Sequence, residues 1–281
     1  MKKFLALISA VALLITGCDG EQQHELPKSD GNAKIGVITR LNADEQEFNQ
    51  QMSKLDANYR PSTANISAQY KYFDKMNDMQ LALESGQIDL LSTYQNVAEY
   101  MIQRSNNKEI LSGERKLEDT FCFAVREGDK MLKNELDKAI KAMTADGTLA
   151  NLSKKYIIDL KNGDDPPEVK INHIDGAKTI KVAVTGDLPP FDMILADATP
   201  AGFSIAVLAE VSKRINKNIE IISVDSVARA SILASKGADV VFWVAVPKNS
   251  NLFPENIDKP TGIAVSEPYY RDFIAHVGLK E

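Results

Sequence analysis

Few side chains in this sequence have the types and the spacing that catalysis requires. Asp187 and Asp192 flank a Pro-Pro-Phe segment and could serve as general acid and base, although acidic residues in such turns commonly act as solvated caps. The three histidines, His24, His173 and His276, are far apart and form neither a metal-ligand cluster nor part of a Ser or Cys triad. The phosphate-binding pattern GxxxxGK is absent from the sequence. These observations argue against an enzyme and favour binding.

Two side chains in apolar surroundings have the chemistry of ligand contacts. Arg229 lies between Ser-Val-Ala and Ala-Ser-Ile, so it is not an obvious surface charge. Its guanidinium could form paired hydrogen bonds with a ligand carboxylate, or a salt bridge on a helix surface. Trp243 lies in an apolar run and could stack on a ligand or cover the core.

Strand-like and helix-like segments alternate along the chain, which predicts an α/β fold with largely parallel strands. In such folds ligands bind beyond the carboxyl ends of the strands, beside helix N-termini. The expected strands are 34–38, 70–73, 88–93, 120–125, 180–185, 219–224, 239–246 and 272–278, and the expected helices are 42–55, 76–86, 95–104, 130–147, 149–157, 204–215 and 227–237.

The loop between the first strand and the first helix contains Thr39, Arg40 and Asn42. Unpaired N–H groups at the start of this helix would form an anion site, which these side chains could supplement. Asn42 has a competing role, because Glu45 follows it at the spacing of a capping box. We expect Asn42 to cap the helix rather than to contact a ligand.

The first eighteen residues have the pattern of a secretory signal, with two lysines, a short apolar run and small residues before Cys18. The run is too short to span a bilayer as a helix. The cysteine after Leu-Ile-Thr-Gly resembles the bacterial lipobox, which implies lipidation of Cys18 and an extracytoplasmic protein anchored to the bacterial membrane. The alternative is an ordinary signal peptide with an incidental cysteine. Residues 19–33 are polar and predict a flexible tether.

The net charge and the cysteine content limit the kinds of partner and cross-link that the protein can have. The formal net charge is −6, which gives no basis for nucleic-acid binding. Cys122 lies in the apolar run Phe-Cys-Phe-Ala-Val and would have no disulfide partner once Cys18 is lipidated. We expect it to be a buried structural thiol.

Residues 179–242 resemble the first lobe of the bacterial extracellular solute-binding proteins of family 3, the amino-acid type of ABC transporter binding protein. The similarity includes the Pro-Pro-Phe after a strand, Gly202-Phe203 at the start of a helix, and Ser-Glu-Pro-Tyr at 266–269, which resembles the crossing between lobes. Residues 34–102 resemble the second lobe, with its Gly-x-x-Asp turn at 86–89. Residues 121–157 resemble the returning strand and the C-terminal helices. The resemblance implies a two-lobed, periplasmic-binding-protein-like type II fold.

The order of these parts is rotated relative to the family, so we interpret the chain as a circular permutation, with lobe 2 first and lobe 1 second. Two incomplete domains in tandem, or a domain-swapped dimer, are the alternatives. The expected parts are a signal peptide (1–18), a tether (19–33), lobe 2 (34–119), the hinge strand and C-terminal helices of lobe 1 (120–160), a linker (161–177), the main part of lobe 1 (178–265), and the hinge crossing with a strand of lobe 2 (266–281).

The resemblance also implies a ligand site between the lobes. Phe191 would pack over the ligand, with a core position as the alternative, and Asp187 precedes it in the same loop. Arg229 and Trp243 would reach the cleft from lobe 1. Tyr94 would reach it from lobe 2, where amino-acid binders often have an aspartate for the ligand ammonium.

Some of the family's ligand contacts are missing from this sequence. Tyr94 is not acidic, Ala206 stands where the family has an acidic residue, and residues 243–260 contain no Thr-x-x-Arg segment. A free amino acid held in the family's usual way is therefore not expected, and a modified amino acid, a peptide fragment, an aromatic compound or another small anion fits as well.

The resulting functional hypothesis is a lipid-anchored binding protein that captures a small polar ligand and delivers it to membrane permease subunits, with no cofactor. A sensing or partner-binding lipoprotein without a transport role is the first alternative. A dehydratase-like enzyme is the second.

Overall fold

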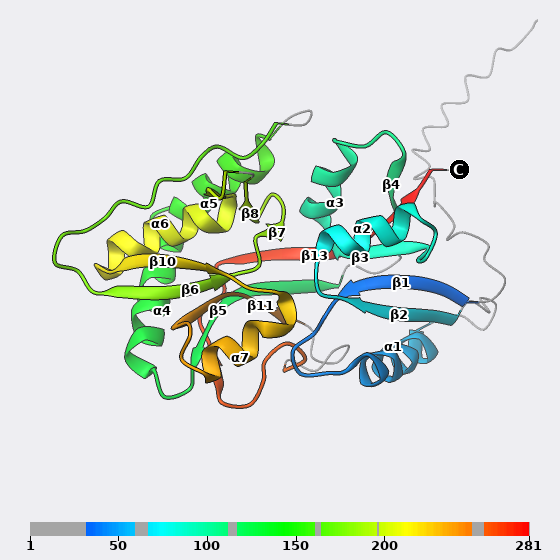
Figure 1. The fold of residues 1–281 in the computed structure, drawn as a ribbon, viewed down its shortest axis with the longest axis horizontal. Coiled ribbons are helices and arrows are strands. Elements are labelled where there is room, and N and C mark those ends of the chain that lie inside the picture. The colour runs from blue at the N-terminus through cyan, green and yellow to red at the C-terminus, as the bar shows by residue number, and fades with distance from the viewer. Residues whose placement is uncertain are drawn as a thin grey trace, which may run out of the picture.

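A curled ten-stranded sheet forms the centre of the computed structural model, which describes residues 32–59, 67–111, 117–160, 164–195, 197–248 and 256–280. The strand order is β10-β6-β11-β5-β13-β3-β1-β2, with β12 paired to β5 and β4 paired to β13 (Figure 1). The signal, Cys18 and nearly all of the tether lie outside the described residues. The ten strands are β1 (Asn32–Ile38), β2 (Ser67–Phe73), β3 (Leu90–Tyr94), β4 (Lys108–Leu111), β5 (Glu118–Arg126), β6 (Thr179–Val184), β10 (Asn218–Ser223), β11 (Val240–Pro247), β12 (Ile263–Val265) and β13 (Tyr270–Leu279).

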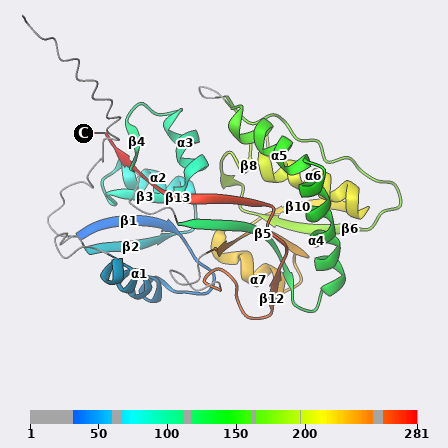
Figure 2. The ribbon, with the colours of Figure 1, turned by 180° about the vertical axis from the view of Figure 1, so that it is seen from behind.

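The sheet has two parallel parts joined by antiparallel strands. Strands β2, β1 and β3 are parallel neighbours in one part, which we call lobe 2, and β10, β6 and β11 are parallel neighbours in the other, lobe 1. Strand β5 pairs antiparallel with β11, while β13 pairs with β5 over residues 270–273 and with β3 over 274–277. Figure 2 shows β5 and β13 running between the two lobes. The lobes are therefore connected through the sheet itself.

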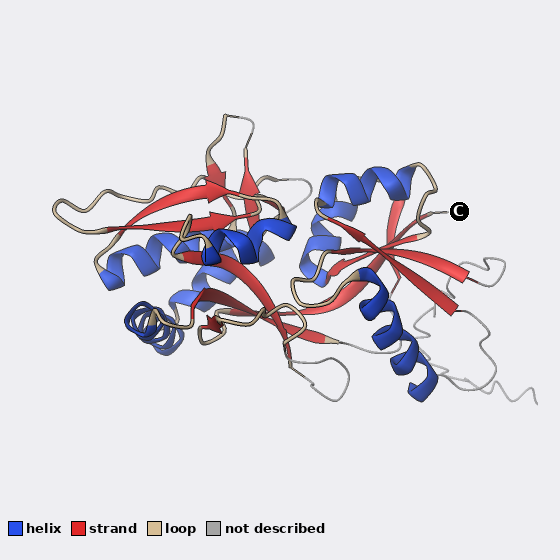
Figure 3. Cartoon of the chain, turned by 60° about the horizontal axis from the view of Figure 1, so that its bottom comes forward, coloured by secondary structure: helices blue, strands red, loops and turns tan. Residues whose placement is uncertain are grey.

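Helices cover the strands of both lobes, as Figure 3 shows in blue and red. In α4, Leu136, Ile140 and Met143 are buried at helical spacing. Helices α4 and α5 pack on α6, so the segment after β5 belongs with lobe 1. The helices are α1 (Glu45–Tyr59), α2 (Met76–Glu84), α3 (Gln95–Ile102), α4 (Lys130–Ala145), α5 (Thr148–Ser153), α6 (Phe203–Ile215) and α7 (Arg229–Ala234), with a π-helical turn at Lys154–Ile158 and a 3₁₀ turn at Ser226–Ala228.

The cap of α1 differs from the prediction. The helix begins at Glu45, and Asp44 forms the capping box: the Glu47 N–H donates to Asp44 Oδ1 at 2.8 Å and the Asp44 N–H to Glu47 Oε2 at 3.1 Å. The prediction that Asn42 caps the helix is wrong, because the capping box forms two residues further along the chain. The expected anion site at this N-terminus is wrong as well, because the Asp44 carboxylate already occupies it.

The segment that contains Phe191 is held by a small three-stranded sheet of β7 (Asp187–Leu188), β8 (Asp192–Ile194) and β9 (Pro200–Ala201). Gly202 follows with a φ of 102°, and a Cβ there would lie 2.6 Å from the Phe191 carbonyl oxygen. Only glycine fits this close approach. The segment thus holds Phe191 in the core, where it is 1% exposed.

Candidate functional site

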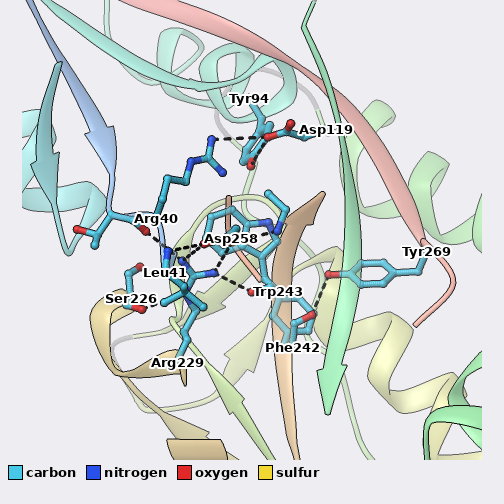
Figure 4. Close-up of polar contacts among 12 residues, drawn as sticks. Arg40, Leu41, Tyr94, Asp119, Ser226, Arg229, Phe242, Trp243, Asp258 and Tyr269 are labelled. Atoms are coloured by element: carbon cyan, nitrogen blue, oxygen red, sulfur yellow. Dashed lines mark hydrogen bonds and ion pairs between the residues drawn. The ribbon is translucent and has the colours of Figure 1, made fainter. Parts of the chain in front are cut away.

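A cluster of Arg40, Tyr94 and Asp119 lies where the ends of β1 and β3 face lobe 1, with Tyr94 and Asp119 buried and Arg40 only slightly exposed (Figure 4). Arg40 Nη2 is 3.6 Å from Asp119 Oδ2, and the Tyr94 hydroxyl donates to the same oxygen at 3.2 Å. Burial raises the pKa of Tyr94 well above its usual value, so the phenol keeps the proton that it donates. Burial also raises the pKa of Asp119, although Arg40 opposes this effect.

Four polar atoms beside this cluster have no hydrogen-bond partner among the described residues. They are Arg40 Nε, Arg40 Nη1, Thr93 Oγ1 and Trp243 Nε1. Thr93 and Trp243 are each 5% exposed. A buried polar atom without a partner destabilises the fold by about 1–3 kcal/mol. Several unpaired polar groups close together are therefore characteristic of a ligand-binding site.

Arg40, Thr93 and Trp243 line one cavity between the lobes. Its volume is about 20 Å³, and the remaining wall is mostly apolar. That volume holds about one water molecule. A ligand as large as an amino acid requires the walls to separate. The lining residues are Val37, Ile38, Arg40, Ser92, Thr93, Tyr94, Leu188, Trp243 and Ile274.

Arg229 lies beside this cavity but has no hydrogen bond to offer a ligand. It is 1% exposed, and its guanidinium lies 4.5 Å from the centre of the Trp243 ring. Its Nε donates to the Ser226 carbonyl, Nη1 to the Trp243 carbonyl and Nη2 to the Thr39 carbonyl. The two remaining hydrogen bonds go to Asp258 Oδ2 and Oδ1 at 3.0 and 3.2 Å. All five N–H groups are therefore used within the protein.

Asp258 is buried as completely as its partner. It also accepts hydrogen bonds from the N–H groups of Leu41 and Ala245, at 3.0 and 3.1 Å. The ion pair thus holds the 256–258 turn against β11 in lobe 1 and against the loop after β1 in lobe 2. The predicted role of Arg229, binding a ligand carboxylate, is not available in this arrangement because Asp258 takes that place. The alternative of a helix-surface salt bridge is wrong too, since both partners are buried.

The other predicted residues divide between the cavity and structural positions. Trp243, Tyr94 and Arg40 line the cavity. Phe191 lies outside it and packs edge-on against Phe121, with ring centres 5.1 Å apart. Its core alternative is therefore the one observed, because the small sheet turns its ring inward.

Three further predictions of ligand contact fall on side chains with protein partners. Thr39 Oγ1 donates to Asp74 Oδ1 at 2.8 Å, and Asn42 Nδ2 donates to the Asn256 carbonyl at 3.0 Å. Asp187 Oδ2 accepts the first N–H of α2, from Met76, at 2.8 Å. The Asp187 contact joins lobe 1 to lobe 2, whereas the Thr39 contact lies within lobe 2, and none of the three side chains lines the cavity.

The sequence did not single out Thr93, Asp119 or Asp258. Thr93 precedes Tyr94 at the end of a predicted strand, and the rule that ligands bind at such ends could have found it. Asp119 and Asp258 gave no local signal. Each is paired with an arginine distant in the chain, Arg40 for the first and Arg229 for the second.

A second cavity, of about 290 Å³, lies against α1 and is lined mainly by polar side chains such as Glu47, Gln50 and Lys54. It is larger, but no arginine or aromatic side chain lines it. The small cavity between the lobes has the buried unpaired donors, and we therefore regard it as the candidate binding site.

The features expected of an enzyme are not assembled in the described part of the chain. Asp187 caps α2, and Asp192 accepts hydrogen bonds from Thr185 and Gly186, so the two carboxylates serve as separate structural groups. Cys122 is buried, as predicted, and burial raises its pKa to about 12, so it stays a thiol. Among the described residues, no cluster of metal-ligating side chains occurs, and no helix could cross a membrane.

The chain belongs to the bacterial extracellular solute-binding proteins of family 3, whose family model matches residues 63–159 and 180–248, more than half of the sequence. This match confirms the family resemblance and the two-lobed α/β fold class predicted from the sequence. The circular permutation stays a prediction. A search of curated protein sequences found no match.

Solved structures of binding proteins are similar at low identity. One is the ligand-binding component of an ABC-type import system from Staphylococcus aureus with zinc bound, at 13% identity and a TM-score of 0.41, covering 88% of this chain and 65% of that one. Another is a probable amino-acid ABC transporter extracellular-binding protein from Bacillus subtilis, at 10% identity and a TM-score of 0.44, covering 89% and 84%. A third is the GluR0 ligand-binding core from Nostoc punctiforme with L-glutamate, at 11% and 0.41, covering 89% and 85%. The chain spans less than two thirds of the staphylococcal chain and 37% of the B. pertussis BvgS periplasmic domain.

Breaking the buried pair from one side should strongly destabilise the protein. Arg229→Met or Asp258→Leu each leaves one uncompensated buried charge, and we expect each to lower the free energy of unfolding by about 3–5 kcal/mol. The double variant should lose clearly less free energy of unfolding than the sum of the two single losses, because neither charge remains buried. Urea unfolding of a form of the protein that begins at Asp19, and so lacks Cys18, measures all three free energies.

The exposed pair of Lys154 and Asp159 provides the control. Lys154→Met should change the free energy of unfolding by at most about 1 kcal/mol. Single losses at Arg229 and Asp258 as small as that of the control would contradict a structural role for the buried pair.

Proposed function

We propose that this protein is a lipid-anchored, extracytoplasmic solute-binding protein that captures a small polar ligand between its lobes and delivers it to an ABC-type permease. The family membership and the cavity of unpaired buried donors between the lobes support this function together. The cavity lies beyond the ends of the parallel strands β1 and β3, where ligands of open α/β sheets bind.

Capture requires the lobes to move, because the cavity holds about one water molecule. The polar contacts that would open include an exposed ion pair between Lys75 and Asp225 and the cap of Asp187 on α2. The paired strands β5 and β13 would act as the hinge. Opening and closing on a ligand is thus compatible with the observed connections.

The single tryptophan of the chain provides a direct test of this function. Trp243 lines the cavity, so a ligand should change its fluorescence as well as the melting temperature. A ligand at 100 times its Kd should stabilise the protein by about 2.7 kcal/mol. The measurement is a screen of the form that begins at Asp19 against amino acids, short peptides and small organic acids. A folded protein that shows neither signal with any compound would argue against solute binding.

We also propose that the chain is a circular permutation of the family's usual order. Val277 of β13 pairs with Leu91 of β3, which pairs with Gly36 of β1. The end of β13 and the start of β1 therefore lie at the same end of the lobe 2 sheet, one strand apart, or about 10 Å. A short connection could join them. The segment 164–177, which would join the usual termini, has no helix and one isolated strand pairing, from Glu168 to Ala201.

A reordered chain tests the permutation. It would begin within residues 161–167, join Lys280 to Asn32 through about four to six glycine and serine residues, and end at Leu160. We expect it to fold with the same far-UV circular dichroism and the same ligand response, because the strand pairings do not depend on this cut. A control that is cut within β5 should not fold. Failure of the reordered chain to fold would count against the permutation.

Lipidation of Cys18 accounts for the proposed anchoring. We expect Cys18→Ser to abolish incorporation of labelled palmitate in a bacterial host and to move the protein from the membrane fraction. Ser9→Ala, within the apolar part of the signal, is the control and should leave both unchanged. Membrane retention and labelling of the Cys18→Ser protein would exclude this anchor.

A further inference from the structure

The unpaired groups at the interlobe cavity are nearly all donors. Arg40 Nε and Nη1 and Trp243 Nε1 can only donate, and the Thr93 hydroxyl can donate or accept. A ligand that satisfies them needs acceptor atoms. An ammonium group, which only donates, would find one possible acceptor among them, the Thr93 hydroxyl.

The carboxylates near the cavity are already committed. Asp119 Oδ2 accepts from Tyr94 and pairs with Arg40. Asp258 accepts two hydrogen bonds from Arg229 and two more from backbone N–H groups. Neither aspartate is among the residues that line the cavity, so an ammonium group there would have no carboxylate beside it. A ligand anion, in contrast, meets groups without partners.

The cation available to an anion is Arg40 and not Arg229. All five N–H groups of Arg229 are bonded within the protein, whereas two polar nitrogen atoms of Arg40 are not. Arg40 comes from the loop after β1 and reaches toward Asp119 and Tyr94 (Figure 4). The anchor for the anion thus belongs to lobe 2.

The rest of the cavity wall is mostly apolar, with Ser92 and Tyr94 as its polar members. Val37 and Ile38 at the end of β1, Leu188 of lobe 1 and Ile274 of β13 line it together with the Trp243 ring. A fully polar anion such as sulfate would have to lose its hydration against these side chains without compensation. A carboxylate with a short aliphatic body matches both parts of the wall.

We infer that the ligand is a small aliphatic carboxylate without an amino group, bound through its carboxylate to Arg40, Thr93 and Trp243. This inference rests on the proposed function and specifies the ligand class of the same site. It distinguishes this protein from a binder of free amino acids, which must satisfy an ammonium group as well.

Three compounds of one carbon skeleton test the ligand class. 3-Methylbutanoate has the carboxylate and the aliphatic body, L-valine adds the ammonium group, and 3-methylbutylamine has the amine alone. Isothermal titration of the soluble form should show binding of 3-methylbutanoate, with L-valine weaker by about tenfold or more and no binding of the amine. The 2-oxo analogue, 3-methyl-2-oxobutanoate, should bind at least as well as 3-methylbutanoate, because it adds an acceptor.

Variants test the residues. Arg40→Gln should weaken 3-methylbutanoate about tenfold or more, and Thr93→Val by a smaller factor. Arg271→Gln, an exposed arginine on β13, is the matched control and should leave the affinity unchanged. If Arg40→Gln does not fold because Asp119 loses its partner, Arg40→Gln with Asp119→Asn removes both charges, and Thr93→Val remains as an independent test.

The outcomes separate this inference from the proposed function. If L-valine binds more tightly than 3-methylbutanoate, or if Arg40→Gln and Thr93→Val leave the affinity for 3-methylbutanoate unchanged, the inferred ligand class is wrong. The proposed function as a solute-binding protein would still stand. No binding by any of the carboxylates would also overturn the ligand class. Other solutes that bind in the broad screen would then still support the proposed function, whereas a flat screen would remove both.

Discussion

The ion pair of Arg229 and Asp258 holds together the turn before α7, strand β11 and the loop after β1. Both side chains are almost completely removed from water, and a buried charge is tolerated only with a partner and a full set of hydrogen bonds. Arg229 makes five and Asp258 accepts four. Their backbone partners lie in the turn before α7, in β11 and in the loop after β1. The pair therefore fixes the position of that loop, which contains Arg40.

The position of Arg40 in turn determines the character of the candidate site. Its guanidinium is neutralised on one side by Asp119, which also receives the Tyr94 hydroxyl, and retains unpaired nitrogen atoms on the other. Two arginines lie near this boundary, Arg229 fully buried and Arg40 slightly exposed, each with its own aspartate. One pair is saturated and structural. The pair of Arg40 and Asp119 leaves nitrogen atoms of Arg40 without a partner. The first pair therefore stabilises the fold, and the second belongs to the candidate site.

The curled sheet allows these groups to meet and also to separate. The parallel strands of each lobe place their connecting loops at the boundary, and β13 pairs with strands of both lobes. An aromatic cluster around Phe121, which contacts Tyr94, Phe191, Trp243 and Tyr270, fills the junction beneath the cavity. Apolar packing of this kind has no directional bonds to break when strands bend slightly, whereas the polar contacts above it are few and local.

The sequence by itself determined the alternation of strands and helices, the family, and three of the residues that line the cavity: Arg40, Tyr94 and Trp243. Periodic burial is a local property of the chain and predicts the alternation. Arg40 follows from its place in the loop after a strand, whereas Tyr94 and Trp243 are implied by the family resemblance. Tertiary structure decided the rest. The partner of Arg229 is Asp258, 29 residues further along the chain, and the partner of Arg40 is Asp119. The role of an arginine depends on which carboxylate the fold brings to it, and hydrogen bonds that close across loops leave no pattern in the local sequence. The cap of α1 is a different case, because Asn42 with Glu45 and Asp44 with Glu47 have the same spacing in the sequence, and the structure shows that the second pair caps the helix. Phe191 has a residue type that fits a ligand contact, but the small sheet around it directs its ring into the core.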